Sequence, residues 1–486
     1  MKRFLKVSAI AALSVASVAG LASGGGGSKE KVYYEPVIPA APEDGATAKS
    51  HEIVFYSTQG DELQKQTDKA IASFEAKFPG WTVKHTSLGG YDKVRDKISS
   101  DLQAGTQPDL AYCYPDHVAR YIPTKKVVNM SHYIENTATV KGVDKDGNEK
   151  DYMIGFTKEE LDDFVKGYYE EGRAKNFDGF KPEFADTIVT LPFVKSTEAL
   201  YYNKDAMKEI GFVDENGEGK APNTWDELWD AARKVKAKHP LSTPLGYDSE
   251  ANWFITMCEQ NGWDYTSVED GKHYQFDNDN TRAWLGELKK IYDEKLFTTK
   301  TLYKGYTSEL FKKGPGDAGS VFSIGSTGGA GHQATEKFNW GVAPIPGSKL
   351  ADGSIHRDNI SQGPSLVMFD SKDKSNAYEK SVMTFMFLKE LLDPTFQAAF
   401  SKTSGYMSSR ISTNSIPKYA KWLDSGDIIS TTIKASIEMK DDYFVSPAFN
   451  GSSTARDQVG TAFVYAVTGQ KTPEKALKDA VRRCGR

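Results

Sequence analysis

The sequence predicts an α/β fold in which the strands of a parallel sheet alternate with helices. Residues 53–56, Ile-Val-Phe-Tyr, form a short apolar run that suits a buried strand. Apolar side chains at helical spacing follow over residues 63–78, and the helix is expected to end before Pro79. Residues 81–83 resume a strand, so the chain opens with a β-α-β unit, the building block of a parallel sheet with crossover helices.

Length and composition indicate a soluble globular protein of about two to four domains, or of two large lobes. Of the 486 residues 39% are hydrophobic and 12% aromatic, which excludes a disordered chain and a multi-span membrane protein. The formal net charge is −5, so no nucleic-acid partner is expected. Three cysteines, at positions 113, 258 and 484, cannot form a disulfide framework and leave at least one thiol unpaired.

Residues 1–23 have the pattern of a secretory signal peptide. Three basic residues stand within the first six positions, and the apolar run that follows over residues 7–22 is too short for a membrane span. Residues 24–49 are rich in Gly, Ser, Pro and Ala, and we expect a flexible stalk there. The folded part is therefore predicted to be periplasmic or otherwise extracytoplasmic.

The end of this signal resembles a bacterial lipoprotein signal with one departure. Residues 21–23 read Leu-Ala-Ser, but Gly24 stands where lipoproteins have the lipid-carrying Cys. Two interpretations stay open. The natural form is lipid-anchored and Gly24 is an engineered or atypical site, or an ordinary signal is cut after residue 22 or 23.

Residues 110–113 predict a further strand that leads into a loop at residues 114–116. In open α/β sheets ligands bind beyond the carboxyl ends of the strands, where Gln59, Tyr91 and this loop are expected. Residues 140–186 form a polar insertion. Its start has Asp and Asn at alternate positions like a calcium loop, but the glycine is misplaced and Gly155 stands where the last ligand should be, which favours a plain turn.

The motifs of common enzyme classes are missing from the sequence. Eight histidines are scattered without an HExxH pair, and there is no P-loop, no Gly-x-Ser-x-Gly elbow and no GxGxxG in a strand-helix context. We therefore predict no cofactor, no metal and no catalytic residue. A glycosidase pair of carboxylates stays open, because such pairs are close only in space.

Four segments follow one another in the order found in a known family. They read Ala-Gly-Thr-Gln-Pro-Asp at residues 104–109, Ala-Leu-Tyr-Tyr-Asn-Lys-Asp at 199–205, Pro-Asn-Thr-Trp-Asp-Glu-Leu at 222–228 and Gly-Val-Ala-Pro-Ile-Pro-Gly at 341–347. Together they are similar to the extracellular solute-binding proteins that feed ABC importers, in the group of sugar and polyol receptors. Thr224 and Glu227 of the third segment also form the pattern of a capping box at a helix start.

This resemblance implies a two-lobed periplasmic-binding-protein fold of the class II type, with hinge strands between the lobes. It implies a first lobe of residues 50–198 and 345–390 and a second lobe of residues 199–344 and 391–486. The crossings would fall near residues 198–202, 341–346 and 388–394. The family's members are not enzymes. The chain is expected to act as a monomer that hands a small solute to an ABC permease in the cytoplasmic membrane.

The resemblance also points to a class of ligand. Maltodextrin receptors stack sugars on tryptophans, but Cys113, Thr327 and Arg456 stand at the matching places, which weakens an oligosaccharide interpretation. Receptors for glycerol 3-phosphate and glycerophosphodiesters are more similar, over residues 193–197, 325–329, 337–342, 362–363 and 403–406 and at Arg456. The ligand would be a polyol phosphate, with an oligosaccharide or sugar as the alternative.

Ten residues are the candidate ligand contacts: Tyr91, Tyr114, Asp116, Ser196, Trp253, Ser326, Thr327, Gly363, Tyr406 and Arg456. A guanidinium offers a permanent forked charge to phosphate, and Thr454 predicts a helix start that places Arg456 in a first turn with free N–H groups. The Gly-rich turn at residues 325–329 would bring further amides and hydroxyls to the same group.

The remaining candidates carry alternatives. Asp116 and Ser196 would bind glycerol hydroxyls or cap turns. In the subgroup an acidic residue follows the tyrosine directly, whereas here Pro115 stands between Tyr114 and Asp116. The four aromatic candidates would form walls of the site, with Trp253 facing a glycerol or choline-like moiety, or would simply belong to the core. Rival functions are an oligosaccharide receptor, a secreted hydrolase and an adhesin.

Overall fold

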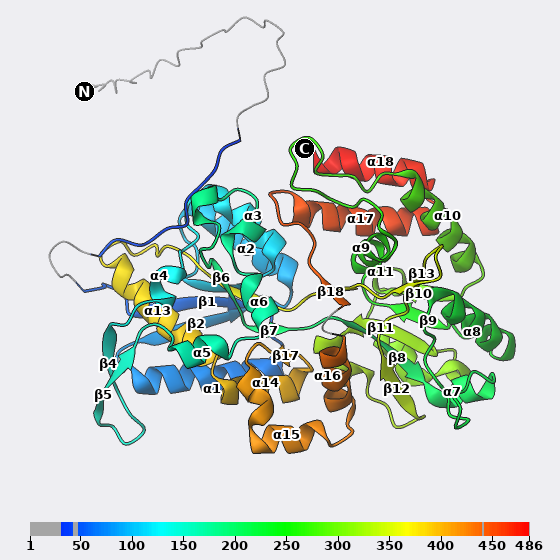
Figure 1. The fold of residues 1–486 in the computed structure, drawn as a ribbon, viewed down its shortest axis with the longest axis horizontal. Coiled ribbons are helices and arrows are strands. Elements are labelled where there is room, and N and C mark those ends of the chain that lie inside the picture. The colour runs from blue at the N-terminus through cyan, green and yellow to red at the C-terminus, as the bar shows by residue number, and fades with distance from the viewer. Residues whose placement is uncertain (1–30, 42–46, 440–441, 486) are drawn as a thin grey trace, which may run out of the picture. The chain divides into compact units, whose positions relative to one another are not determined.

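The computed structural model describes residues 31–41, 47–439 and 442–485 (Figure 1). Residues 34–486 form one compact unit. The predicted signal peptide, Gly24 and most of the predicted stalk lie outside the described residues, so lipid anchoring stays a prediction. Within the described part of the chain, no helix combines the length and the apolar character needed to cross a bilayer.

The first sheet confirms the predicted β-α-β opening. Its strands run in the order β2 (Thr82–Ser87), β1 (Glu52–Ser57), β3 (Leu110–Cys113), β16 (Ser365–Met368) and β6 (Thr190–Pro192). Strand β1 pairs in parallel with β2 and β3, and α1 (Asp61–Lys77) is the crossover helix. The sheet is mixed rather than wholly parallel, because β16 returns from a distant part of the sequence and runs antiparallel to β3 and β6.

The second sheet has the order β10 (Phe297–Thr299), β9 (Leu245–Tyr247), β11 (Phe322–Ser326), β8 (Glu198–Asn203) and β12 (Trp340–Ala343). Strands β10, β9 and β11 are parallel, whereas β8 runs antiparallel to both β11 and β12. Residues 198–202, predicted as a crossing, are thus the start of a strand inside this sheet.

Separate hydrophobic cores pack the helices against the two sheets, and each sheet with its helices forms a lobe. The core of the first sheet includes Phe55 and Phe387, and the core of the second sheet includes Trp253 and Phe463. In Figure 1 the first lobe carries α1, α2 (Tyr91–Ala104), α13 (Ala377–Leu391) and α14 (Pro394–Ser404), and the second carries α8 (Trp225–Lys238), α9 (Glu250–Asn261), α10 (Asp279–Asp293), α17 (Ser452–Val467) and α18 (Pro473–Cys484).

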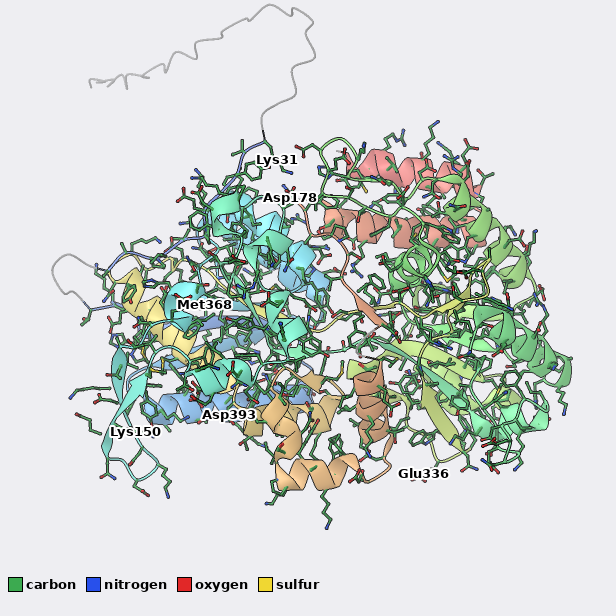
Figure 2. The ribbon with its side chains drawn as sticks, viewed as in Figure 1. Lys31, Lys150, Asp178, Glu336, Met368 and Asp393 are labelled. Atoms are coloured by element: carbon green, nitrogen blue, oxygen red, sulfur yellow. The ribbon has the colours of Figure 1, made fainter. Side chains whose placement is uncertain are left out.

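Smaller helices complete the two lobes. They are α3 (Pro115–Tyr121), α4 (Ser131–Ile134), α5 (Lys158–Asp162), α6 (Lys166–Glu170), α7 (Lys204–Glu209), α11 (Lys300–Tyr303), α12 (Ser308–Lys313), α15 (Pro417–Leu423) and α16 (Ile428–Glu438). Met368 at the end of β16 lies among the elements of the first lobe (Figure 2).

Short paired segments lie between the two sheets. Strand β7 (Val194–Lys195) pairs with β17 (Met407–Ser408), and β15 (Asn359–Ile360) pairs with β18 (Tyr443–Phe444) (Figure 1). Residues 388–394 do not form the predicted crossing, because they end α13 and begin α14, and Leu391 is buried in the first core. Phe400 is buried in the same core. The predicted change from the first lobe to the second near residue 390 stays a prediction.

The polar insertion begins with a hairpin of β4 (Thr139–Val143) and β5 (Glu149–Met153). Its turn is held by Asp144, whose Oδ1 accepts 2.9 Å hydrogen bonds from the backbone N–H groups of Asp146 and Asn148. This is the plain turn that the sequence favours. Lys150 on β5 is exposed and lies at the outer edge of the first lobe (Figure 2).

The predicted capping box at α8 is half right. Thr224 Oγ1 accepts a 3.3 Å hydrogen bond from the backbone N–H of Glu227. The return bond to Glu227 comes from the N–H of Asn223, at 2.7 Å, instead of from Thr224 itself. The carboxylate therefore satisfies the donor one residue before the cap.

Candidate functional site

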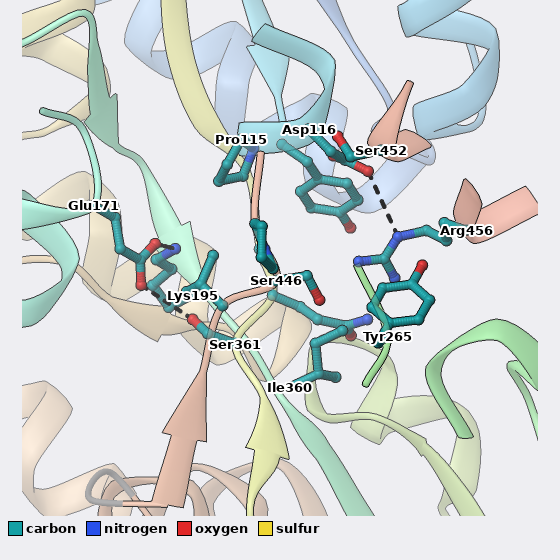
Figure 3. Close-up of a pocket in the computed structure, with 15 residues that line it drawn as sticks. Pro115, Asp116, Glu171, Lys195, Tyr265, Ile360, Ser361, Ser446, Ser452 and Arg456 are labelled. Atoms are coloured by element: carbon teal, nitrogen blue, oxygen red, sulfur yellow. Dashed lines mark hydrogen bonds and ion pairs between the residues drawn. The ribbon is translucent and has the colours of Figure 1, made fainter. Parts of the chain in front are cut away.

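A cavity of about 580 Å³, including the solvent at its mouth, opens between elements of the two lobes (Figure 3). It is lined by residues 114–116 after β3, residues 360–363 after β15, residues 445–447 after β18, and Glu171, Lys195, Tyr265, Ser452 and Arg456. Of the ten candidates, Tyr114, Asp116, Gly363 and Arg456 reach this cavity. Figure 3 shows two charged groups of residues at opposite ends of it.

One end holds Arg456 on α17. Its Nη1 donates a 2.6 Å hydrogen bond to Asn252 Oδ1, and its Nε lies 3.6 Å from Asp116 Oδ2. The Nε has no hydrogen-bond partner among the described residues. Burial opposes the charge, but Asp116 and the phenols of Tyr265 and Tyr114 together raise the pKa of Arg456. The guanidinium is a permanent cation that still has donor capacity.

The helix that carries Arg456 begins earlier than predicted. Helix α17 starts at Ser452, and its N-cap is Gly451, at φ +124°. Thr454 is therefore inside the helix, and Arg456 lies in its second turn instead of its first. Ser452 lines the cavity, so the first turn of α17 still brings the positive end of the helix dipole to this end, although the N–H of Ser452 itself donates a 3.0 Å hydrogen bond to Phe449 O.

Tyrosines join the wall of the cavity to the Gly-rich turn of the second lobe. The rings of Tyr91 and Tyr114 stack with centroids 4.2 Å apart, and Tyr91 Oη lies 3.3 Å from Tyr406 Oη. Burial raises the pKa of Tyr91 and of Tyr114 well above the ordinary value, so both hydroxyls stay neutral. Tyr406 in turn packs closely over Gly328 in η5 (Thr327–Gln333).

The hydroxyl candidates serve the connection between the lobes. Thr327 Oγ1 accepts a 3.1 Å hydrogen bond from the N–H of Thr197, and Thr327 is fully buried. Ser326 Oγ accepts from the N–H of Gly328 at 3.2 Å. Ser196 exchanges two backbone hydrogen bonds with Gln362. None of these three residues lines the cavity in the described part of the chain.

Gly363 fits its position only as a glycine. Its φ is +98°, and a Cβ there would lie 2.4 Å from the carbonyl oxygen of Val194. The absence of a side chain lets the segment after β15 pass close to the segment around β7. This approach brings residues 360–363 and Lys195 to the same cavity.

Trp253 does not line this cavity. It is 1% exposed, and its ring stacks on Tyr247 with centroids 4.7 Å apart. Helix α9 presents this residue to the second sheet, where it packs with Trp225, Phe297 and Phe463. Trp253 therefore belongs to the core, the alternative that its residue type left open.

The other end of the cavity was missed by sequence reasoning. Lys195 forms an ion pair with Glu171, and its side chain is only 3% exposed. Ser361 Oγ donates a 3.2 Å hydrogen bond to the same carboxylate (Figure 3). Lys195 is the charged residue among the apolar and small residues 193–197, and this contrast could have indicated that it belongs to the site. Glu171 lies in the polar insertion among many acidic residues, and nothing in the sequence distinguishes it.

Gly328 provides a test of the contact between the turn and Tyr406. A Cβ at Gly328 would lie 2.5 Å from Tyr406 Cζ. We expect Gly328→Ala to lower the free energy of unfolding by about 2 kcal/mol, because the half-buried ring of Tyr406 has to move. Urea denaturation measures the change. Gly329→Ala is the matched control, since a Cβ there meets nothing nearer than His332 at 3.8 Å. Equal effects of the two substitutions would contradict the contact.

Comparison with known proteins gives one family for most of the chain. Residues 69–424 match the family described as bacterial extracellular solute-binding protein. The sn-glycerol-3-phosphate-binding periplasmic protein UgpB of Escherichia coli strain K12 is 24% identical over 441 residues, covering 89% of this chain and 91% of the relative. UgpB of Yersinia pseudotuberculosis is 24% identical over 448 residues, with the same coverage of 89% and 91%.

Solved structures of similar shape bind different solutes. UgpB of Mycobacterium tuberculosis in complex with glycerophosphocholine has a TM-score of 0.65 at 16% identity, covering 90% of this chain and 98% of that one. The GacH receptor of Streptomyces glaucescens, solved unliganded and with acarbose, has a TM-score of 0.66 at 17% identity, covering 89% and 98%. Maltose-bound MalE3 of T. maritima has a TM-score of 0.65 at 18% identity, covering 89% and 99%. These likenesses confirm the predicted two-lobed α/β fold.

Proposed function

Because the chain belongs to the bacterial extracellular solute-binding protein family, it is the solute-binding component of an ABC importer, and we propose that its ligand is glycerol 3-phosphate or a glycerophosphodiester. Members of this family are receptors and not enzymes. The proposal includes capture of the solute between the two lobes by a monomer and its delivery unaltered to a permease.

One observation carries the choice of an anionic ligand. Arg456 is a charged guanidinium at the cavity whose Nε has no hydrogen-bond partner among the described residues. The first turn of α17 adds the positive end of its helix dipole, although the N–H of Ser452 itself donates to Phe449 O. A phosphate oxygen in this place would receive charge-assisted hydrogen bonds from the guanidinium and would be attracted by the helix dipole. The glycerol-3-phosphate-binding relatives favour the same ligand.

A sugar is the second candidate, and the balance of charges favours it. Each cation at the cavity already has a carboxylate beside it, Arg456 with Asp116 and Lys195 with Glu171. These four charges sum to zero, which suits a neutral polyol whose hydroxyls both donate and accept. Similar structures with acarbose and maltose point to the same alternative.

Binding between lobes implies a simple mechanism of signalling. A ligand that contacts both lobes stabilises the closed state by its differential affinity for that state. Reversing a population of about 10:90 to 90:10 takes about 2.6 kcal/mol of such differential affinity. The permease would then recognise the closed receptor.

Titration calorimetry with three ligands tests the proposal. The protein is first unfolded and refolded to remove any solute that copurifies, and is then titrated with glycerol 3-phosphate, glycerophosphocholine and maltose. We expect at least one of the two phosphate compounds to bind and maltose to give no heat. Binding of maltose alone would replace the proposal with the sugar receptor.

A further inference from the structure

A buried carboxyl lies behind the candidate anion site. Glu198 begins β8 and is 2% exposed. Its Oε1 accepts a 2.9 Å hydrogen bond from Asn252 Nδ2, and its Oε2 accepts a 2.5 Å hydrogen bond from Tyr247 Oη. Both partners are neutral. Among the described residues, no lysine, arginine or histidine forms an ion pair with this carboxyl.

Asn252 connects this carboxyl to the cavity. Its Nδ2 donates to Glu198, while its Oδ1 accepts a 2.6 Å hydrogen bond from Arg456 Nη1. A single amide therefore links the carboxyl to the guanidinium. Arg456 lies next to two carboxyls, Asp116 at 3.6 Å and Glu198 through the amide. His117 Nε2 also lies 3.9 Å from Asp116 Oδ1, but burial lowers the pKa of this imidazole and favours its neutral form.

The surroundings of Glu198 set its protonation. Burial is the largest cause that raises the pKa of Glu198, to about 7, and the nearby carboxyl of Asp248 raises it further, while Tyr247, Asn252 and Arg456 act in the opposite direction. Asp248 is itself held by hydrogen bonds from Thr307 N and Oγ1, at 2.8 and 2.9 Å.

Two further neighbours of Glu198 among the described residues carry no charge. Ser326 on β11 lies opposite Glu198 in the sheet, and Asn359 on β15 donates a 2.7 Å hydrogen bond to its backbone oxygen.

We propose that Glu198 is a proton-linked positioning residue: when an anion pairs with Arg456, Glu198 takes up one proton from solvent. The inference rests on the proposed anionic ligand. An arriving anion would be the third negative group around Arg456, after Asp116 and Glu198. Glu198 is buried and forms no ion pair among the described residues, so its protonation relieves the repulsion among the three groups.

The hydrogen-bond network can hold both protonation states. The proton from solvent forms an O–H bond at Oε2, and this group donates to Tyr247 Oη after the phenol hydrogen rotates away from Glu198, since a phenol oxygen both donates and accepts. Oε1 goes on accepting from Asn252 Nδ2, so Asn252 Oδ1 keeps facing Arg456. The guanidinium holds its place while the charge behind it disappears.

Two measurable consequences follow. If anion binding raises the pKa of Glu198 by about one unit, binding at pH 7 consumes about 0.4 proton, and affinity at pH 8 is about fivefold weaker than at pH 6. A neutral sugar would consume none. The probe is glycerophosphoglycerol, a phosphodiester without a group of its own that titrates near neutrality.

The experiment is calorimetry at pH 7 in buffers of different ionisation enthalpy, which gives the number of protons taken up. We expect wild type to take up about 0.4 proton and Glu198→Gln to take up almost none, with affinity independent of pH between 6 and 8. Asp248→Asn is the matched control and should keep the uptake. Undiminished uptake by Glu198→Gln, or its loss only in Asp248→Asn, would overturn the proposal.

A second variant acts on the same carboxyl without removing it. Tyr247→Phe deletes a hydrogen bond that favours the ionised form, so the pH at which uptake is largest should move upward. An unchanged pH profile in a folded Tyr247→Phe protein would count against the proposal even if Glu198→Gln does not fold.

Failure of the proposed function gives a different pattern. If maltose binds and no phosphate compound does, the ligand is wrong, and the ionisation of Glu198 is read from melting temperatures between pH 5 and 8. A pKa raised in the folded state means that wild type loses stability relative to Glu198→Gln as the pH rises from about 4.5 to 7. Melting curves that stay parallel over this range would overturn the inference about Glu198 independently.

Discussion

Arg456→Ala is expected to lower the affinity for glycerol 3-phosphate by about 100-fold or more. The substitution removes a cation whose Nε has no hydrogen-bond partner among the described residues and which faces the cavity beside the first turn of α17. Charge-assisted hydrogen bonds in a partly enclosed site contribute about 3 kcal/mol, which corresponds to a factor of about 100 in affinity. Calorimetry measures the loss.

Two further variants separate charge from shape at this position. Arg456→Lys keeps the charge but loses the fork, and we expect it to recover part of the affinity. Arg233→Ala removes an exposed arginine that pairs with Glu294 on the surface of the second lobe, and it should leave affinity unchanged. The melting temperature of Arg456→Ala is expected to fall, because Asp116 and Asn252 lose a partner, so affinities are compared between variants that are shown to be folded. Full affinity in Arg456→Ala would remove this residue from the site.

Lys195→Met is expected to lower the free energy of unfolding by about 3 kcal/mol. The substitution leaves Glu171 as a carboxylate beside a mostly buried position without its cation. The hydroxyl of Ser361 donates one hydrogen bond to that carboxylate and cannot replace a charge. Urea unfolding followed by circular dichroism measures the change.

The double variant Lys195→Met with Glu171→Gln tells a lost charge pair from lost packing. It removes both charges and keeps the hydrogen bond from Ser361, so most of the stability should return. Glu171→Gln alone leaves the buried ammonium unpaired and should be destabilising as well. If the double variant is as unstable as Lys195→Met, the cost comes from packing of the lysine stem and not from the ion pair.

Local patterns predicted the local parts of the fold. The apolar run of β1 and the helical spacing of α1 are written in adjacent residues, and both elements formed where expected. The place of β16 could not be predicted in this way. Its pairing joins Ser365 to Cys113, residues far apart in the sequence, and such a register depends on how the whole chain folds.

The candidate site likewise has parts that the sequence predicted and parts that it did not. Tyr114, Asp116, Gly363 and Arg456 reach one cavity because matched segments carry positions from a related fold. The start of α17 was misplaced, because Thr454 is a good cap by residue type but the chain turns at Gly451, where φ is positive. Residue type does not tell whether an aromatic side chain faces the cavity or the core, and Trp253 faces the core.

The strand order of the first sheet has a consequence for biosynthesis. Because β16 (Ser365–Met368) lies between β3 and β6, a nascent chain that ends before residue 365 leaves both neighbouring strands with an unpaired edge. The first sheet is thus completed only after residues 365–368 have been synthesised. A first sheet that closes late would suit the export that residues 1–23 predict, because a secretory channel accepts an unfolded precursor.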